Sequence, residues 1–131
     1  MPLMEAERMD AEPADARALL GAAGEDAALD VYLRAGFRLV VRNWSCALGE
    51  LDLVVRRGRL LVFCEVKTRS GSAFGGGYES VTWSKRRKLR QLAEAFLTQT
   101  SVRPATVRFD VASVFCSGVR PAEVELFQDA F

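Results

Sequence analysis

Residues 60–68 read LLVFCEVKT, and this stretch decides the fold class. The unbroken apolar run at 60–64 predicts a central β-strand that is covered on both faces. Because side chains alternate along a strand, Phe63, Glu65 and Lys67 are expected on one face. An isolated pair of this kind usually lies on a solvated surface. Here the strand continues from a buried apolar run, so Glu65 and Lys67 are expected to be buried or half-buried. Burying these charges costs free energy unless they are paired or bind a metal.

The segment before this strand adds a second carboxylate. A strand is expected over 50–56, and a two-residue turn at 57–58 joins it to the central strand as a hairpin. This turn places Asp52 opposite Phe63 and diagonally adjacent to Glu65, on the same face. Backbones at such a diagonal lie roughly 7–8 Å apart, close enough for two carboxylates to share a cation.

Two carboxylates beside a lysine predict a site for a hard cation such as Mg²⁺. A lysine next to such an ion orients a water molecule or stabilises charge that develops on a phosphorane. The alternative is a plain ion pair between Glu65 and Lys67. The residues alone leave that alternative open.

The rest of the chain predicts a mixed sheet flanked by helices, in the order α-β-β-β-α-β, with a short further strand at the edge. Apolar periodicity, glycines and turn residues set the expected bounds. They are helices at 19–35 and 84–99 and strands at 37–41, 50–56, 59–68, 106–115 and 124–127. Residues 43–48 are expected to form a loop, and the Gly-rich residues 69–79 a mobile flap beside the site. An acidic tail at 1–15 precedes a single domain at 16–131.

The first expected helix turns one apolar face toward the sheet. Its members are Ala27, Ala28, Val31, Tyr32 and Ala35. Asp26 and Asp30 point away from that face, whereas Glu25 lies at its edge and is able to point inward. On a later strand, Asp110 is expected to form a structural salt bridge.

Five basic residues gather at the start of the second expected helix. They are Lys85, Arg86, Arg87, Lys88 and Arg90. The N-terminal end of a helix already carries a positive dipole, so this placement destabilises the helix unless an anion lies there. We therefore expect the cluster to bind nucleic-acid phosphates. The alternative is a solvated basic face that nearby acids balance.

The composition excludes several classes of chemistry. The chain has no histidine, which removes Ser–His and Cys–His catalysis and imidazole metal sites. Three scattered cysteines without a CxxC spacing predict neither a zinc site nor a disulfide framework. The longest apolar run is too short to cross a bilayer, and the acidic N-terminal residues are unlike a signal peptide. We expect a cytoplasmic protein without a membrane partner.

Several of these segments together resemble the YraN-like bacterial family. They are GEDAA (24–28), YL (32–33), RN (42–43), GELDL (49–53), VFCEVKTR (62–69), FG (74–75), Lys85 and RFDV (108–111). That family is similar to archaeal Holliday-junction resolvases and to other nucleases of the PD-(D/E)xK type. The resemblance therefore implies an α/β restriction-endonuclease-like fold with a three-layer core.

The resemblance also assigns roles to individual residues. Asp52 and Glu65 match the two metal-binding acids, and Lys67 matches the catalytic lysine. Glu25 matches a catalytic glutamate on the first helix that completes some resolvase sites. The backbone carbonyl of Val66 is a further implied metal ligand.

The expected function is that of a Mg²⁺- or Mn²⁺-dependent endonuclease that hydrolyses phosphodiester bonds in structured or branched DNA. The expected partner is nucleic acid, with DNA favoured, and a homodimer is raised because related resolvases are dimers. One alternative is a non-catalytic nucleic-acid-binding protein that retains the nuclease fold. The other is an interaction module without a nucleic-acid role, which the basic cluster disfavours.

Overall fold

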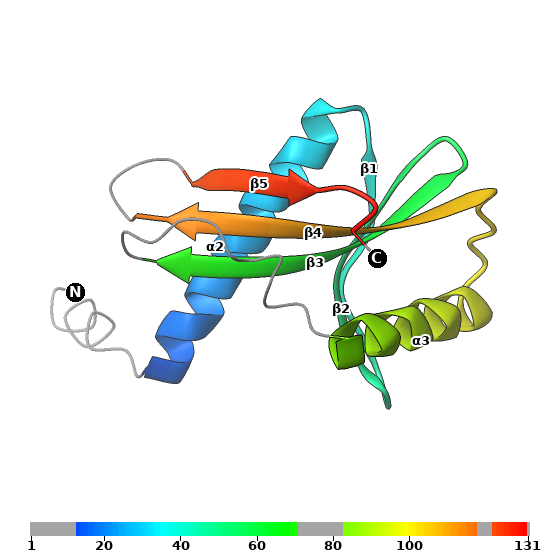
Figure 1. The fold of residues 1–131 in the computed structure, drawn as a ribbon, viewed down its shortest axis with the longest axis horizontal. Helices are drawn as coiled ribbons and strands as arrows, with labels where there is room; N and C mark the ends of the chain where they lie inside the picture. Colours follow the sequence, from blue (N-terminus) through cyan, green and yellow to red (C-terminus); the bar gives the residue numbers. More distant parts are fainter. Residues whose placement is uncertain (1–12, 71–82, 118–121, 131) are drawn as a thin grey trace, which may run out of the picture.

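A computed structural model describes residues 13–70, 83–117 and 122–130, which form a five-stranded mixed sheet and two helices (Figure 1). In chain order the elements are helix α2 (Pro13–Arg34), strands β1 (Arg38–Cys46), β2 (Gly49–Arg57) and β3 (Leu60–Ser70), helix α3 (Trp83–Gln99), and strands β4 (Thr106–Cys116) and β5 (Glu123–Phe127). This order confirms the predicted α-β-β-β-α-β succession and the short last strand. Among the described residues, no helix combines the length and apolarity that crossing a membrane requires.

Strand β3 occupies the middle of the sheet, whose spatial order is β1-β2-β3-β4-β5. It pairs in parallel with β4 from Leu60↔Thr106 to Ser70↔Cys116, whereas all other neighbours are antiparallel. Its first half is buried, with Val62 fully inaccessible to solvent. The prediction of a central strand covered on both faces is therefore confirmed.

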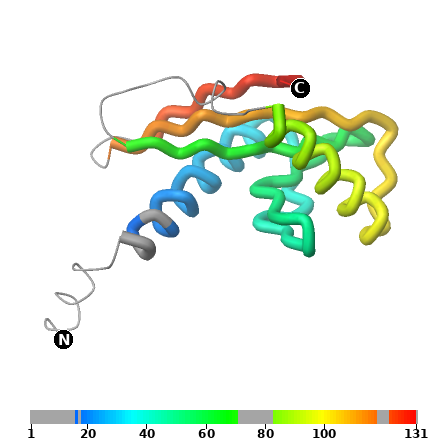
Figure 2. The backbone as a smooth tube through the Cα atoms, turned by 60° about the horizontal axis from the view of Figure 1, so that its bottom comes forward, coloured from blue at the N-terminus to red at the C-terminus, as the bar shows by residue number. Residues whose placement is uncertain are grey.

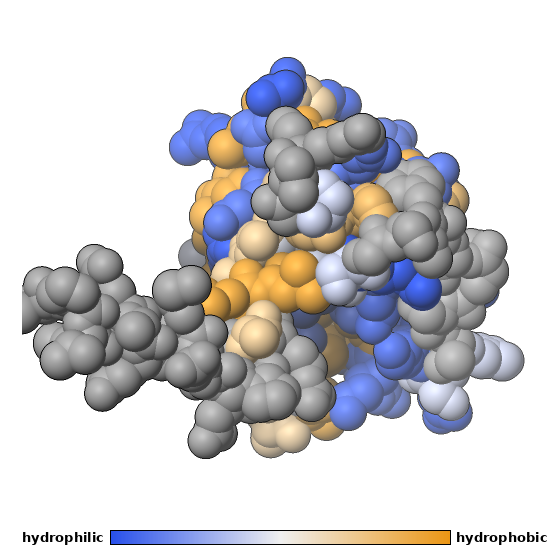
Figure 3. Space-filling view, turned by 90° about the vertical axis from the view of Figure 1, so that its left-hand side faces the viewer, coloured by the Kyte–Doolittle hydropathy of each residue, from blue (hydrophilic) through white to orange (hydrophobic). Residues whose placement is uncertain are grey.

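The two helices pack on opposite faces of the sheet, because alternate residues of the strands feed two separate cores. Ala28 and Tyr32 of α2 pack on one face of the sheet, against Val62 and the other strand residues whose side chains point to that face. Leu92 and Phe96 of α3 pack against the other face, which is lined by Leu51, Val54, Leu61 and Phe63. Seen from the side, apolar side chains gather in the middle of the surface and hydrophilic ones lie around them (Figure 3).

Strands β1 and β2 run steeply across the direction of β3 and β4 (Figures 1 and 2). Pairing between β2 and β3 covers only Leu53↔Cys64 to Arg57↔Leu60, at one end of the hairpin. The N-terminal half of β2 continues to pair with β1 instead. The sheet thus opens between β2 and β3 immediately beyond Leu53, where Asp52 follows.

The predicted register of this hairpin is wrong by two residues. The turn is formed by Gly58 and Arg59, and Gly58 adopts the left-handed φ of 60° that such a turn requires. Continuing the observed register puts Asp52 level with Glu65 rather than opposite Phe63. Because the shift is an even number, Asp52 keeps its predicted face.

Two further boundaries differ from the predictions. The expected loop at 43–48 is mostly strand, because β1 extends to Cys46 and pairs there with Gly49. Asn43 sits within that strand at a φ of 54°, a conformation that asparagine tolerates. Helix α2 begins at Pro13, within the last residues of the expected tail. The rest of that tail and most of the expected Gly-rich flap lie outside the described residues.

Candidate active site

Asp52 stands where β2 separates from β3, and its side chain bridges the opening. Its Oδ2 atom accepts a hydrogen bond of 2.9 Å from the backbone N–H of Val66. The Asp52 carboxylate thus accepts the hydrogen bond that a backbone carbonyl of β2 would have accepted if the pairing of β2 with β3 had continued. The predicted metal ligand Val66 is accordingly adjacent to Asp52, through its amide group.

Glu65 and Lys67 share one face of β3, as predicted from the strand alternation. Lys67 Nζ lies 3.3 Å from Glu65 Oε1, and both side chains are largely buried, with 23% and 16% of their surfaces exposed. The side chains of Glu65 and Asp52 also lie within hydrogen-bonding reach of each other. The structure therefore brings Asp52, Glu65 and Lys67 together, and it contains the Glu65–Lys67 ion pair that the sequence left open.

The carboxyl group of Asp52 is held in an environment that disfavours its charge. Burial, followed by repulsion from Glu65, raises the pKa of Asp52 to about 7, although the Val66 N–H favours the charged form. The charge of Glu25 raises this pKa further. Near neutral pH, a carboxyl group in this environment takes up a proton or attracts a cation.

Glu25 reaches the same region from α2 and is anchored by β1. Its Oε1 atom accepts hydrogen bonds from Arg42 Nε at 3.3 Å and from Asn43 Nδ2 at 3.1 Å. Arg42 also pairs with Asp26 at 2.6 Å, so it clamps the middle of α2 to the sheet. The side chain of Glu25 is only 13% exposed, as expected for its place at the edge of the apolar face.

Gly24 allows α2 to approach β3 at this point. A Cβ atom at position 24 would overlap the side chain of Thr68, so no larger residue fits without displacing the helix or the strand. The close approach brings the next residue, Glu25, near enough to act on Asp52. The resemblance implied a role for Glu25 but not this reason for its position.

Helix α3 closes the other side of the site. A cleft of about 210 Å³ is lined by Gly49, Glu50, Glu65, Lys85, Lys88, Leu89 and Leu92. Lys88 lies beside Gly49, whose φ of 143° is accessible mainly to glycine. Glu65 of the central strand therefore opens into a cleft whose far wall carries two lysines.

Lys85, which the sequence predicted as a member of the basic cluster, also contacts the site itself, and that contact was not predicted. It lies within hydrogen-bonding reach of Lys67, and the hydrogen bond from Lys67 and its charge lower the pKa of Lys85. Burial acts to lower the pKa of Lys67, but the hydrogen bond with Lys85 and the charge of Glu65 outweigh it, so this pKa is raised. Spacing along the chain gave no sign of this contact, which depends on how α3 packs.

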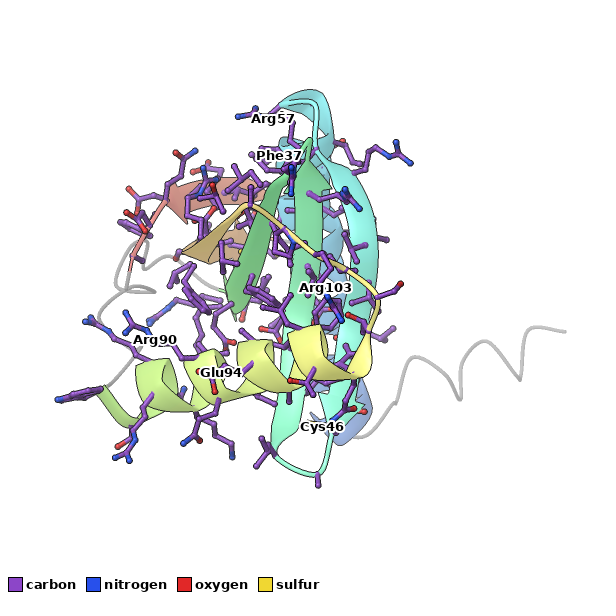
Figure 4. The ribbon with its side chains drawn as sticks, turned by 90° about the vertical axis from the view of Figure 1, so that its right-hand side faces the viewer. Phe37, Cys46, Arg57, Arg90, Glu94 and Arg103 are labelled. Carbon is purple, nitrogen blue, oxygen red and sulfur yellow. The ribbon has the colours of Figure 1, made fainter. Side chains whose placement is uncertain are left out.

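The predicted basic cluster divides between two directions around α3. Lys85 and Lys88 line the cleft. The guanidinium group of Arg90 lies 5.9 Å from the ring of Phe109 on β4, and Figure 4 shows Arg90 one turn before Glu94. Arg86 is half-buried and Arg87 is exposed. The cluster therefore surrounds the first turns of the helix rather than forming one flat surface.

Asp110 has the structural role that was predicted for it. It is fully buried and pairs with Arg108, whose Nε atom lies 2.9 Å from Oδ1. Tyr32 donates a hydrogen bond of 2.6 Å to its Oδ2 atom, and the backbone N–H of Asp129 donates to Oδ1 at 3.0 Å. This carboxylate joins α2, β4 and the residues after β5.

Within the part of the chain that the structure describes, no three Asp, Glu, Cys or His side chains are grouped closely enough to enclose a metal ion. Glu25 influences Asp52 without completing such a group. Any ion here would be held by Asp52 and Glu65 with the help of backbone oxygen and water, which is the manner of binding that Mg²⁺ prefers.

Comparison with known proteins shows which family the chain belongs to. The model of "Uncharacterised protein family UPF0102" matches residues 24–114, a range that includes Glu25, Asp52, Glu65 and Lys67. A UPF0102 protein of Frankia alni is 45% identical over 116 residues, which cover 88% of this chain and 97% of the relative. One from Pelotomaculum thermopropionicum is 44% identical over 119 residues, covering 90% and 99%. The chain belongs to the UPF0102 family, the YraN-like family that its sequence resembles.

Proposed function

We propose that this protein is a Mg²⁺- or Mn²⁺-dependent endonuclease that hydrolyses phosphodiester bonds in structured or branched DNA. The observation that carries the proposal is the convergence of Asp52, Glu65 and Lys67 where β2 and β3 separate. A mixed sheet between two helices, with Glu65 and Lys67 on its central strand and Asp52 on the neighbouring strand β2, is compatible with the restriction-endonuclease-like fold. We therefore infer a PD-(D/E)xK nuclease domain.

The residues present fit a hard divalent cation. The donors are carboxylate oxygens, which Mg²⁺ and Mn²⁺ accept, and the chain has no histidine, so the imidazole ligands that favour softer metals are not available. Burial, together with repulsion from Glu65, raises the pKa of Asp52 to about 7. A cation held by both carboxylates would remove that repulsion. Val66 would contribute its backbone carbonyl.

The chain's own side chains would divide the work of the reaction. The bound cation would supply Lewis-acid polarisation of a phosphate oxygen and of a water molecule. Lys67, on the same face as Glu65, would orient the attacking water and stabilise the negative charge that develops on the phosphorane. Lys85, on the opposite wall of the cleft, would donate a hydrogen bond to a phosphate oxygen. Glu25 would hold a water molecule at the edge of the site.

Substrate binding would depend on the start of α3. We infer that Lys85, Arg86, Arg87, Lys88 and Arg90 contact backbone phosphates on either side of the scissile bond. The cleft between Gly49 and α3 leads directly to Glu65, so a strand held by this helix passes the carboxylates. Contacts of this kind bind any sequence, which suits recognition by DNA structure rather than by base.

A second candidate is a nucleic-acid-binding protein that retains the nuclease fold without catalysis. One observation favours it: the Glu65–Lys67 ion pair satisfies both charges without a metal. A binding protein would not, however, benefit from the carboxyl group of Asp52, which lies in an environment that disfavours its charge.

The test is incubation of the purified protein with a panel of linear, flapped, forked and four-way DNAs. Each substrate is tested with Mg²⁺, Mn²⁺ or EDTA, beside Asp52→Asn prepared identically. Cleavage by the wild type alone, dependent on the metal, supports the nuclease. Equal cleavage by the variant shows a contaminant or another site. Binding without cleavage in every metal condition supports the second candidate.

A further inference from the structure

The far end of the β2–β3 hairpin carries a group of arginines that takes no part in the candidate active site. Arg38, Arg56 and Arg57, here called the arginine tip, line a hollow of about 280 Å³ together with Gly36 and Gly58. All three arginines are exposed. Figure 4 shows Arg57 at one end of the molecule and Cys46, from the other end of the β1–β2 pair, at the opposite end.

Two members of the arginine tip face each other directly. Arg38 of β1 pairs with Arg56 of β2 in the antiparallel register, so their side chains leave the same face of the sheet. Cβ atoms of such a pair lie about 4.5–5.5 Å apart, and like charges placed directly opposite destabilise a sheet. The register therefore holds two positive charges together at an energetic cost.

No carboxylate in the described part of the chain forms a salt bridge with the arginine tip. Within residues 13–70, 83–117 and 122–130, no salt bridge involves Arg38, Arg56 or Arg57. Nearby Arg34 differs, since its Nε atom lies 3.0 Å from Asp30 on the same helix. A positively charged hollow without acidic partners attracts anions.

A structural role accounts for Arg57 alone. Its Nη1 atom donates a hydrogen bond of 2.8 Å to the carbonyl of Ala35 at the end of α2, and its guanidinium lies 4.4 Å from the centroid of the Phe37 ring. Arg56 reaches only the backbone carbonyl of Gly58, at 3.2 Å. Arg38 makes no side-chain hydrogen bond within the described residues. The opposed pair is thus available to a ligand.

We propose that the arginine tip is a second binding site for nucleic-acid phosphates, which holds the same DNA at a distance from the candidate active site. Guanidinium groups bind phosphate oxygens through paired, charge-assisted hydrogen bonds, and two of them converge here. Glu65 lies five residues along β3 from Leu60, where the hairpin begins to turn. At about 3.3 Å per residue the separation is about 17 Å, or about five base steps of a DNA strand.

The test measures DNA binding in EDTA, so that it does not depend on cleavage. A labelled linear duplex is titrated over a range of salt concentrations with wild type, Arg38→Gln/Arg56→Gln and Arg38→Lys/Arg56→Lys. Losing two phosphate contacts should reduce the steepness of log binding constant against log salt concentration by about 1.8. If the two proteins bind equally at 1 M salt, the variant should then bind about 60-fold more weakly at 0.1 M. The lysine variant should keep most of the slope. Arg34→Gln, which removes a charge already paired with Asp30, should leave it unchanged.

Folding is checked by thermal unfolding, where the glutamine variant should be at least as stable as wild type because its opposed charges are gone. A slope within error of wild type in a folded variant overturns the proposal. So does stabilisation of wild type by inorganic pyrophosphate with no change in DNA binding, which would indicate a site for small anions.

The proposal deepens the proposed function, yet the two fail separately. If the glutamine variant loses the slope while no DNA is cleaved in Mg²⁺, the second site stands and the nuclease does not. If wild type cleaves DNA in Mg²⁺ and Lys85→Ala/Arg86→Ala/Arg87→Ala loses DNA binding while the arginine-tip variant does not, the second site falls and the nuclease stands.

Discussion

Asp110 and Asp52 lie on the two strands that flank β3, and their surroundings are opposite in kind. Asp110 is fully buried and accepts hydrogen bonds from Tyr32, from Arg108 and from the backbone of Asp129. Asp52 is only half-buried, accepts one backbone N–H, and faces another carboxyl group. The more deeply buried carboxylate is therefore the better satisfied one.

The difference separates structural acids from acids that need a ligand. A buried carboxylate with enough donors lowers its own electrostatic cost and links the elements that supply them. A carboxylate that lies beside another carboxylate and accepts too few hydrogen bonds remains electrostatically unfavourable until it binds a proton or a cation. Burial alone does not distinguish the two.

The largest expected effect concerns catalysis. In an active preparation, Asp52→Asn and Glu65→Gln should each reduce DNA cleavage by about 1,000-fold or more, comparable to losing a main electrostatic group of an active site. The readout is initial rate with Mg²⁺ on the preferred substrate. Glu50→Gln is the matched control, since Glu50 lines the same cleft but is not among the groups that raise the pKa of Asp52, and it should retain its rate. Equal losses in all three variants would remove the special status of Asp52 and Glu65.

The next effect is on stability and falls on the other aspartate. Asp110→Asn should lower the free energy of unfolding by about 3 kcal/mol, because it leaves Arg108 with a neutral partner in a buried network. Asp52→Asn should leave stability unchanged or raise it without metal, since it removes repulsion. Urea denaturation of both variants measures the contrast. A larger loss for Asp52→Asn would reverse the assignment of the two acids.

A smaller effect appears in the pH dependence. The pKa of Asp52 is about 7 in the folded protein and near its ordinary value of 3.8 in the unfolded chain, so the folded state binds the extra proton between these values. Its contribution to stability is complete below about pH 4, declines as the pH rises, and is lost above about pH 7. The steepest decline is about 1.4 kcal/mol per pH unit. Wild type without metal should lose more stability over this range than Asp52→Asn, and parallel curves would contradict the raised pKa.

The smallest expected effect concerns metal affinity. Lys67→Met should eliminate cleavage but bind Mn²⁺ as tightly as wild type or several-fold more tightly, because a positive charge beside Glu65 opposes a divalent cation. Calorimetry with Mn²⁺ on both proteins measures it. Reduced affinity in the variant would instead make Lys67 a structural partner that keeps Glu65 charged.

Much of the site followed from the sequence because strand alternation is local. The apolar run before Glu65 predicted the central strand, and alternation put Asp52, Glu65 and Lys67 on one face even though the turn formed one residue later than expected and shifted the register by two. The turn itself was ambiguous, because Gly58 is able to occupy either position of a two-residue turn. An odd shift would have moved Asp52 to the other face.

Other features depend on tertiary packing and left no local signal. Lys85 meets Lys67 only because α3 packs against the face of the sheet that carries Lys67. Strand β1 extends through a segment with turn-like residues because β2 supplies hydrogen-bond partners as far as Gly49. The intrinsic preference of these residues for a turn is weaker than the stabilisation from pairing with β2, so the expected loop forms a strand.

The parallel pairing of β3 with β4 also determines when the site is completed during synthesis. The partner of Leu60 is Thr106, which the ribosome adds 46 residues later (106 − 60). The hairpins β1–β2 and β2–β3 involve near neighbours and form early, whereas closing this long connection is slow. Glu65 and Lys67 therefore stay on an unpaired strand edge until most of the chain has emerged. A nascent chain attached to its own messenger thus does not yet carry the assembled site.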